Sequence, residues 1–450
     1  MTDTRPSDPT VTDRQAIIDD LDRQLSATSR ASRPHEHAVI AYRLGLAHAE
    51  STSGAPADGL RKALACYDVA AAIFDPRFEP VQHARVLNAA GAAHRGLGDR
   101  NKAAKLFEEA ARLLEDHDND AERAAALNNL GLVRAELGLI DQAVEAFDAA
   151  ADLFDVRTPD GRRGRVATLH NRGQAHHAKG GEEGLEAALA DFEEARSILD
   201  FEEAPYHFGL VEHSVGVTCS ALAVVRPDER SQLLEEAVRA FSTSLEVFTR
   251  TSFPFQFALA KHNLGLAYLN QGGTANLRRA LTSFEDAVAI LDTRVHADAW
   301  RQAYASLERA EKDLEATVPG STRAEHFAAL CASVRDDERM ALVNARLFRL
   351  MALPEPRRTT ALAELSLAVA NLGYDGARKV IEAQLKSVME MPTDNHAVVL
   401  GAMNEAHRRL GGDPRDQADR ALDQAIGDAL GGPQRVYVRD YLVSVGWERP

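Results

Sequence analysis

The chain has little of what a disulfide-linked, metal-binding or membrane-spanning protein needs. Its 450 residues include only three cysteines, Cys66, Cys219 and Cys331, which lie far apart and form no CxxC pair. This spacing argues against a disulfide scaffold and a zinc ribbon, and it favours reduced thiols packed as small apolar residues. No stretch approaches 18 consecutive apolar residues, so we expect no transmembrane helix. The first residues, MTDTRPSDPTVTDRQ, lack a basic segment followed by an apolar one. We therefore predict no signal peptide and a cytoplasmic location.

Aromatic residues are also scarce, at 6% of the chain, whereas alanine and leucine are abundant. This composition favours helices, because strands prefer β-branched and aromatic residues, and we predict an all-α fold. The formal net charge of -16 is unevenly distributed: residues 320–450 contain 17 Lys+Arg and 18 Asp+Glu, whereas residues 1–319 contain 35 and 50. An acidic surface repels the phosphates of nucleic acids and anionic membranes. We therefore expect neither as a partner, and favour a basic or neutral protein segment.

Two segments of the chain repeat each other at a period of 40 residues without a gap. LNAAGAAHRGLGDRNKAAKLFEEAARLL begins at Leu87, and LNNLGLVRAELGLIDQAVEAFDAAADLF begins at Leu127. Four weaker copies surround them, and every copy has a glycine, then an aromatic residue, then a small residue three positions after the aromatic. The glycines are Gly45, Gly91, Gly131, Gly173, Gly216 and Gly265; the aromatics are Tyr67, Phe107, Phe147, Phe192, Phe241 and Phe284; the small residues are Ala70, Ala110, Ala150, Ala195, Ser244 and Ala287.

The glycine and the aromatic residue of each copy predict a helical hairpin. A glycine inside a helix costs about 1 kcal/mol of helix propensity relative to alanine, so a recurring glycine needs a packing reason. We predict that the aromatic ring of the second helix packs into the gap that the glycine leaves in the first helix. The small residue, one turn after the ring, keeps that face thin enough for the next hairpin to stack. A single hairpin buries too little surface, and stacking gives a continuous core.

This pattern resembles the tetratricopeptide repeat family, which has Leu-Gly in its first helix, then Ala-xxx-Phe and a further Ala in its second. The matching residues in the third copy are Leu130, Gly131, Ala143, Phe147 and Ala150. The LNNLG string and a period above the usual length of about 34 residues resemble the longer repeats of kinesin light chains and of bacterial arrays attached to caspase-like domains. The resemblance covers roughly residues 37–317 and implies a right-handed α-solenoid. Arg172 and Ala90 replace the leucine before the glycine, and the fifth copy, VEHSVGVTCS, is degenerate.

The repeat limits suggest three parts: an N-terminal tail and helix (1–34), a solenoid of six hairpins and a capping helix (35–319), and a helical C-terminal region (320–450). The capping helix is expected at Asp298–Ala316. Six further helices are expected at Thr322–Val334, Glu338–Met351, Thr359–Ala370, Asp375–Met389, His396–Leu410 and Asp416–Leu430. NLGYDGARKVIEA and AHRRLGGDPRDQADRALDQA echo the repeat, so degenerate repeats and a separate bundle both stay open for residues 320–450. A short strand and a docking helix both stay open for VYVRDYLVSVGW.

No motif in the sequence predicts catalysis, a cofactor or a metal ion. His170 and His177 lie two helical turns apart, a rise of about 10.5 Å, which is too far for both to bind one ion. The glycine pairs lack the GKS/T or GxGxxG context of a phosphate-binding loop, and GxSxG and HExxH are missing. We therefore predict that the protein is not an enzyme and carries no cofactor.

A row of polar residues lies three positions before the six glycines, in otherwise apolar helices. Its members are Tyr42, Asn88, Asn128, His170, His213 and His262. The resemblance implies that this position faces the concave groove and contacts a bound peptide, with Arg95, Gln174 and His177 one or two turns further along. Asn and His both donate and accept hydrogen bonds, which suits a peptide backbone. The alternative is a merely solvated helix face, and the next position (Asn129, Asn171, Asn263) competes for the same role.

The sequence thus predicts a non-enzymatic adaptor or scaffold that binds a peptide or helix of a partner in its groove. An assembly or maturation chaperone for a multi-subunit enzyme is an alternative. A peptide-sensing regulator is a second one, without its own DNA-binding module, because residues 12–50 provide only one acidic amphipathic helix before the first repeat. Histidine has an unperturbed pKa of about 6.5, so we expect binding to weaken on acidification from roughly pH 7.5 to 5.5. We expect alanine at Asn128, His170 and His213 to leave stability almost unchanged.

Overall fold

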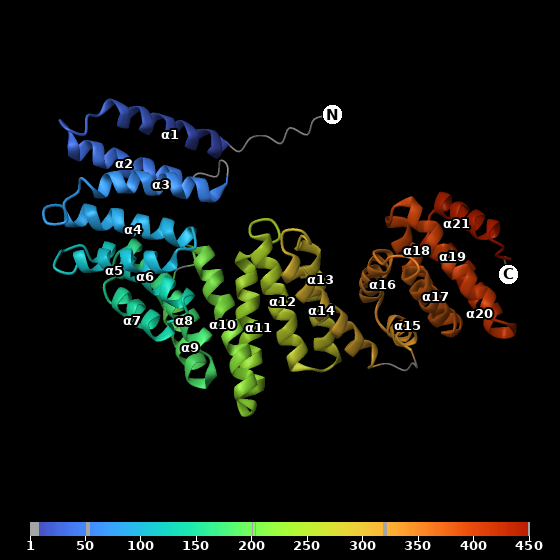
Figure 1. Cartoon of the computed structure of the whole chain (residues 1–450). Coiled ribbons are helices and arrows are strands. Elements are labelled where there is room, and N and C mark those ends of the chain that lie inside the picture. Colours follow the sequence, from blue (N-terminus) through green and yellow to red (C-terminus); the bar gives the residue numbers. More distant parts are fainter. Residues whose placement is uncertain (1–8, 51–54, 200, 203, 318–321, 449–450) are drawn as a thin grey trace. The chain divides into compact units, whose positions relative to one another are not determined.

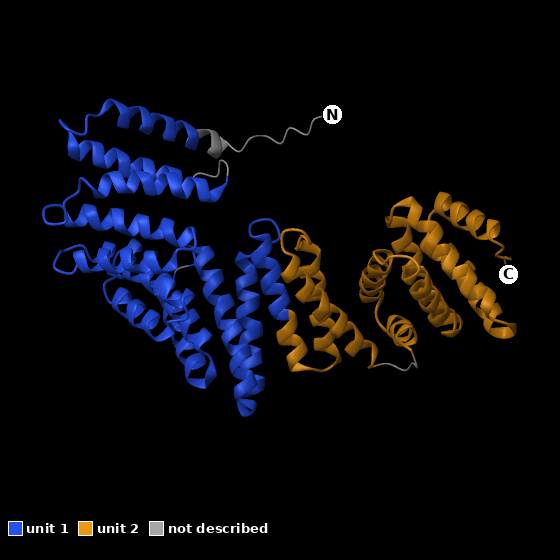
Figure 2. Ribbon diagram, in the orientation of Figure 1, with its two compact units in different colours: residues 1–264 blue, residues 265–450 orange. Residues whose placement is uncertain are grey.

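The computed structural model describes residues 9–50, 55–199, 201–202, 204–317 and 322–448. Throughout these ranges the secondary structure consists of α-helices and one short 3-10 helix, Pro227–Glu229, with no strand. The predicted all-α class is therefore confirmed. The chain forms two compact units, residues 1–264 and 265–450 (Figure 2). The boundary that we predicted at Pro319–Gly320 lies outside the described residues, and the division into three parts stays a prediction.

Unit 1 is a stack of helical hairpins that follows a single helix, α1 (Pro9–Ala27) (Figure 1). Each hairpin pairs two consecutive helices that pack along each other. The pairs are α2 (Pro34–Ala49) with α3 (Pro56–Ala71), α4 (Pro80–Gly96) with α5 (Arg100–Leu113), α6 (Asp120–Glu136) with α7 (Ile140–Ala151), α8 (Pro159–Lys179) with α9 (Gly181–Ile198), and α10 (Pro205–Val225) with α11 (Arg230–Val247). The next helix, α12 (Pro254–Gln271), runs across the limit between the two units.

Proline begins several helices, and glycine connects two pairs of them. Helices α4, α10 and α12 begin at Pro80, Pro205 and Pro254, because the first helical turn needs no backbone N–H from the proline. Gly98 and Gly138 connect the two helices of their hairpins with φ values of +84° and +77°. Residues with a side chain rarely adopt this left-handed region, so the glycines allow these tight connections.

The glycine–ring contact is present in all six copies. A Cβ atom added to Gly131 would lie 2.6 Å from Cε1 of Phe147, and the corresponding distance in the six copies is 2.4 to 2.7 Å. No side chain fits between glycine and ring at that separation. The small residue three positions after the ring has no exposed surface in any copy. The fifth copy, with Gly216 and Phe241, has the same contact despite its degenerate sequence.

The first helices of the hairpins line one side of the unit 1 stack. Helix α2 contacts α4, α4 contacts α6, α6 contacts α8 and α8 contacts α10. The second helices from α3 to α9 pack mainly against the first helices of their own and the following hairpin, and α11 packs along α10. Because the first helices approach one another, they form the inner side of the stack. We call this surface of unit 1 the inner face.

Helix α10 bears on the expectation that the chain has no transmembrane helix, which stays a prediction. It is the one helix in the described part of the chain that is long and apolar enough to cross a membrane by length and composition. Half of its most apolar window is buried within the protein, where Val211, Val215, Cys219 and Leu222 lie in the core between α9 and α11. Polar residues such as Glu212 and His213 interrupt its apolar run, which is why a search for continuous runs missed it.

Unit 2 begins within α12 and contains the predicted capping helix and the six helices predicted after it. Helix α13 (Thr274–Ile290) packs along α14 (Ala297–Glu315), which is the expected capping helix. The helices that follow are α15 (Arg323–Ser333), α16 (Asp336–Met351), α17 (Arg357–Ala370), α18 (Gly373–Glu390), α19 (Thr393–Arg409), α20 (Gly412–Ala429) and α21 (Gly432–Ser444). Most of VYVRDYLVSVGW therefore lies in a helix, α21, and the strand alternative is wrong.

The packing of α15 to α21 differs from that of the hairpins. Each of these helices packs mainly against the second-next helix, so that α15, α17, α19 and α21 form one row and α16, α18 and α20 form another. Consecutive helices touch only briefly. A buried core runs from Phe284 and Leu314 through Phe327 to Trp447. The glycine–ring hairpin is thus not continued after α14, even though parts of the sequence echo it.

Candidate functional site

The six residues of the polar row lie on the first helices α2, α4, α6, α8, α10 and α12, and all six are half-buried. Behind several of them lies the ring that fills the glycine gap. His170 packs on Phe192 with ring centroids 5.6 Å apart, and His213 packs on Phe241 at 5.5 Å. The hairpin core therefore supports the polar row directly.

Hydrogen bonds connect the polar row of one hairpin to the next hairpin. In two of them the row residue accepts from the residue that directly follows the row residue of the next hairpin. Asn129 Nδ2 donates to Asn88 Oδ1 at 3.0 Å, and Asn171 Nδ2 donates to Asn128 Oδ1 at 3.0 Å. The two positions that competed for one role in the sequence analysis thus act together. We call this set of bonds the polar ladder.

The polar ladder continues through α8, α10 and α12. His170 Nε2 lies 3.0 Å from Ser214 Oγ, and Asn263 Nδ2 lies 3.0 Å from His213 Nε2. An amide N–H donates to an imidazole nitrogen only if that nitrogen carries no proton, so His213 is neutral with its hydrogen on Nδ1. The ladder spans the first helices from α4 to α12.

These bonds change what the row residues contribute to stability. Asn128 Oδ1 accepts from both Asn171 and Thr168, whose Oγ1 lies 3.2 Å away. A half-buried hydrogen bond contributes about 0.5–1.5 kcal/mol, and a partner left unpaired costs more. Alanine at Asn128, His170 and His213 therefore weakens the contact between hairpins, contrary to our expectation that stability would be almost unchanged.

The two histidines of the ladder, His170 and His213, have pKa values well below neutral pH. Burial lowers the pKa of His170 to about 4, with smaller contributions from His207 and His213. Burial also lowers the pKa of His213 to about 4 and lowers the pKa of His262. His170 and His213 therefore stay neutral between pH 7.5 and 5.5 and are not a source of the expected change of binding, which stays a prediction.

The three residues predicted further along the helices have different surroundings. Arg95 Nε donates to Glu136 Oε1 of the next hairpin at 2.7 Å, so its charge is already paired. Gln174 is exposed, and its Nε2 lies 3.4 Å from His170 Nε2. Within the described part of the chain, Nε2 of His177 is buried without a hydrogen-bond partner. The structure thus joins Gln174 to the ladder and pairs Arg95 separately.

A pocket of about 160 Å³ opens on the inner face between α8 and α10. Its apolar lining comes from Val166, Ala167, Leu210 and Val211, and its polar lining comes from His170, Asn171 and His207. Sequence reasoning identified His170 and Asn171 but missed His207. The signal for His207 was a polar side chain in the first turn of α10, on the helix that also carries His213.

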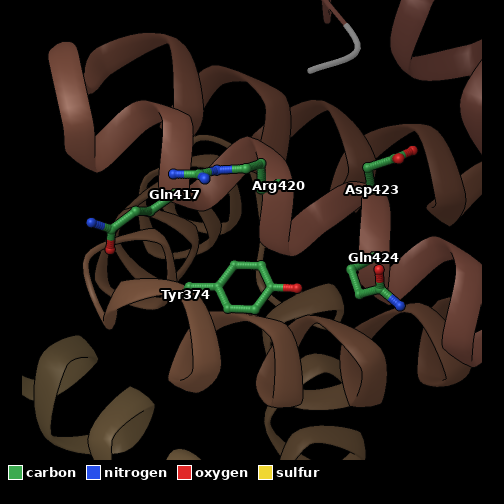
Figure 3. Close-up of a pocket in the computed structure, with 5 residues that line it drawn as sticks. All are labelled: Tyr374, Gln417, Arg420, Asp423 and Gln424. Atoms are coloured by element: carbon green, nitrogen blue, oxygen red, sulfur yellow. The ribbon is translucent and has the colours of Figure 1, made fainter.

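A wider cavity of about 610 Å³ lies in unit 2 between α18 and α20. Tyr374 of α18 lies across from Gln417 and Arg420 of α20, with Asp423 and Gln424 further along (Figure 3). These polar groups are engaged locally: Arg420 donates to a carbonyl of its own helix, Asp423 accepts from Arg439, and Gln424 donates to Asp428. Because no donors converge on the space, we assign it no ligand. No group of three or more His, Cys, Asp or Glu side chains in the described ranges is placed to hold a metal ion.

Comparison with known proteins finds similarity to solved structures alone. No model of a known protein family matches the sequence, and no curated protein matches it either. Solved structures that are similar include tetratricopeptide proteins, and every hairpin of unit 1 shows the glycine–ring contact that this repeat type implies.

Three of these similar structures differ widely in how much of each chain is aligned. TTC0263, a thermophilic TPR protein of Thermus thermophilus, is 19% identical over 50% of this chain and 99% of its own, with a TM-score of 0.33. The apo form of RapI is 13% identical, the alignment covers 72% of this chain and 97% of RapI, and the TM-score is 0.37. The human IFIT1 dimer with m7Gppp-AAAA is 15% identical, the alignment covers 90% of this chain and 77% of the IFIT1 chain, and the TM-score is 0.37. What these proteins bind is not transferred to this chain, and the absence of a nucleic-acid partner stays a prediction.

Proposed function

We propose that this chain is a non-enzymatic scaffold that binds an extended peptide segment of a partner protein along the inner face of unit 1. The observation that supports this most is the pocket between α8 and α10, because it combines an apolar lining with hydrogen-bonding groups. An apolar side chain of the peptide would enter the pocket. Burial of such a side chain contributes about 1.5–3 kcal/mol, which is enough to define a preferred position along the peptide.

The polar groups of the pocket would hold the peptide backbone. Asn171 uses its Nδ2 for Asn128, and its Oδ1 is an acceptor that a peptide N–H can reach. His207 is exposed on α10 at the same pocket and can donate or accept through its imidazole. The alternating N–H and C=O groups of a peptide backbone match the hydrogen-bonding groups of Asn171 and His207.

The charge and the cysteines of the chain define the partner and the location that we propose. The 35 Lys+Arg against 50 Asp+Glu in residues 1–319 favour a basic or neutral peptide. We propose that the protein acts in a reducing cytoplasm. In support, Cys219 and Cys331 are buried free thiols and Cys66 is a half-buried one, and burial raises the pKa of the Cys219 thiol to about 12.

A peptide-display selection on the purified full chain tests the proposal. We expect enriched sequences to share one aliphatic residue and to carry no net negative charge. Ala167→Leu fills the pocket and His207→Ala removes an exposed polar group, so each is expected to lower the affinity for the selected peptides at least tenfold. Neither change touches a ladder bond, so both variants should keep the melting temperature of the wild type.

Matched controls separate the pocket from general surface effects. Ala178→Leu adds the same side chain at an exposed position of α8, and His117→Ala removes an exposed histidine between α5 and α6. Both controls should bind like the wild type. Peptides that bind Ala167→Leu and the wild type equally, or a selection that enriches nothing, would contradict the proposal.

A further inference from the structure

A group of aromatic side chains continues the inner face of unit 1 beyond the pocket between α8 and α10. Tyr206, Leu210 and His213 are spaced by four and three residues, so they lie on one face of α10. Leu210 lines the pocket, and Tyr206 lies one turn nearer the start of the helix. The ring of His207, which also lines the pocket, lies 5.8 Å from the ring of Tyr206. The pocket and the aromatic group therefore form one continuous surface.

Tyr206 and Phe253 form the centre of this aromatic group. Their ring centroids are 5.1 Å apart, and the two rings lie 5.9 and 5.8 Å from the ring of Phe248. Phe248 is 1% exposed, whereas Tyr206 and Phe253 are half-buried. A buried ring thus holds two partly exposed rings in place. We call Tyr206 and Phe253 the aromatic shelf.

The polar groups beside the aromatic shelf favour an uncharged ligand that presents a carbonyl group. Gln256 Nε2 donates to the hydroxyl oxygen of Tyr206 at 3.5 Å, so the hydroxyl can donate its own hydrogen to a ligand. Arg250 and Lys261 each lie 5.5 Å from the centre of the Phe257 ring, in the first turn of α12. Because like charges repel, these two cations disfavour a lysine or arginine of a peptide at the shelf.

The spacing between the pocket and the aromatic shelf fits a polyproline II helix. The pocket lies between α8 and α10, and the shelf joins the start of α10 to the residue before α12. Packed helices lie about 8–10 Å apart, so pocket and shelf are separated by about that distance. A polyproline II helix has about three residues per turn and rises about 3.1 Å per residue. Residues three positions apart therefore lie on the same side, about 9 Å from each other.

We propose that the aromatic shelf binds a proline three residues away from the apolar residue in the pocket, and that the partner segment binds as a polyproline II helix. This inference rests on the proposed function, because pocket and shelf would hold the same peptide. Proline suits the shelf because its apolar ring packs on aromatic rings and because proline-rich segments adopt this conformation before they bind. Proline also has no N–H that would need an acceptor, and the hydroxyl of Tyr206 can donate to a carbonyl of the segment.

Synthetic copies of the peptides that the display selection enriches test the inference on the full chain. We expect these peptides to carry a proline three residues before or after the shared aliphatic residue. Replacement of that proline by alanine should lower the affinity about tenfold, which corresponds to about 1.4 kcal/mol. Replacement of a proline at any other spacing should leave the affinity almost unchanged. Fluorescence anisotropy of labelled peptides measures these affinities.

Phe253→Ala removes one ring of the aromatic shelf and locates the contact. It should lower the affinity for the proline peptide about tenfold and change the affinity for the alanine peptide little, because the ring and the proline act as a pair. Phe78→Ala is the matched control, since Phe78 is 80% exposed and, like Phe253, lies in a loop that precedes a first helix. The control should bind both peptides like the wild type.

The melting temperature shows whether Phe253→Ala is folded, and if it is not, the proline and alanine peptides decide the test with the wild type alone. The inference is overturned if the selected peptides lack a proline at this spacing, if its replacement by alanine leaves the affinity unchanged, or if a folded Phe253→Ala affects both peptides equally. In these cases the proposed function still stands as long as Ala167→Leu lowers the affinity. A selection that enriches no peptide overturns both.

Discussion

Substitution of Gly131 and Phe147, separately and together, tests the contact on which the hairpins of unit 1 depend. Phe147 has no exposed surface, and a Cβ atom at Gly131 would lie 2.6, 2.7 and 2.8 Å from three atoms of its ring. Carbon atoms pack best at about 3.5–4.0 Å, so an added methyl group must displace the ring. Alanine at Gly131 is therefore disfavoured only as long as the ring is present.

The magnitudes follow from these contacts. Phe147→Ala removes a buried ring and is expected to cost about 3–5 kcal/mol. Gly131→Ala gains about 1 kcal/mol of helix propensity but overpacks the hairpin by about 1–3 kcal/mol, so it is neutral to destabilising in the wild type. In the Phe147→Ala background the overpacking is gone and the added methyl enters the vacated space. There Gly131→Ala should stabilise the protein by about 1 kcal/mol, which reverses its sign.

Urea denaturation followed by circular dichroism measures the changes in unfolding free energy on the full chain. Because repeat arrays need not unfold in one step, hydrogen exchange of the amides in α6 and α7 shows where the changes act. The control places Gly131→Ala in a Phe241→Ala background, because that ring packs against Gly216 instead. There the effect of Gly131→Ala should equal its effect in the wild type within about 0.5 kcal/mol. An effect of Gly131→Ala that is the same in the Phe147→Ala background as in the wild type would refute the reasoning.

Two further predictions concern buried polar groups of unit 2. Burial raises the pKa of Glu285 from 4.5 to about 7, so the fold favours the protonated acid, and its contribution is full below pH 4.5 and is lost as the pH rises through 7. The wild type should therefore lose about 2–3 kcal/mol of unfolding free energy between pH 5 and pH 8 that Glu285→Gln keeps. Urea unfolding of both proteins at the two pH values measures this difference. Trp447 is 4% exposed and its Nε1 donates to Asp419 at 3.2 Å, so Trp447→Ala should cost about 3–5 kcal/mol. Trp447→Phe should cost about 1.5–3 kcal/mol, mainly through the lost bond to a charged group; equal melting temperatures of the three proteins would contradict this.

The hairpins could be predicted from the sequence because their determinants are local. A glycine in one helix and a ring in the next are separated by a short turn, so the spacing between Gly131 and Phe147 nearly fixes their contact. The helices of residues 322–448 could be predicted for the same reason, since proline, glycine and apolar periodicity mark each helix separately. Even the degenerate fifth copy keeps Gly216 against Phe241.

The polar ladder could not be predicted, because each of its bonds joins helices of different hairpins. Asn88 and Asn129 are 41 residues apart, and His213 and Asn263 are 50 residues apart. Nothing in the sequence of one helix shows that the row residue of one copy pairs with the neighbouring position of the next. The low pKa values of His170 and His213 follow from the same burial between helices, so the sequence of a single helix could not show that these two side chains stay neutral.

In unit 2 the local sequence pattern did not predict how the helices pack. The segments NLGYDGARKVIEA and AHRRLGGDPRDQADRALDQA resemble the repeat, yet α18 packs mainly against α16 and α20, not against its neighbours in sequence. Glycines in these segments have no ring beside them: a Cβ atom at Gly411 would meet no atom within 4 Å. The echo of the repeat thus lacks the one contact that makes a hairpin.

The core of a hairpin and the candidate binding site of unit 1 are coupled through single side chains. Gly173 lets the ring of Phe192 approach α8, with a virtual Cβ atom only 2.6 Å from the ring. The same ring supports His170, whose Nε2 lies 3.0 Å from Ser214 of the next hairpin and whose side chain lines the pocket between α8 and α10. A methyl group at Gly173 would displace Phe192, and the displaced ring would move His170. The pocket would then change shape although none of its own residues had been substituted. The glycines therefore define not only how tightly each hairpin packs but also the position of the side chains that we propose hold the peptide.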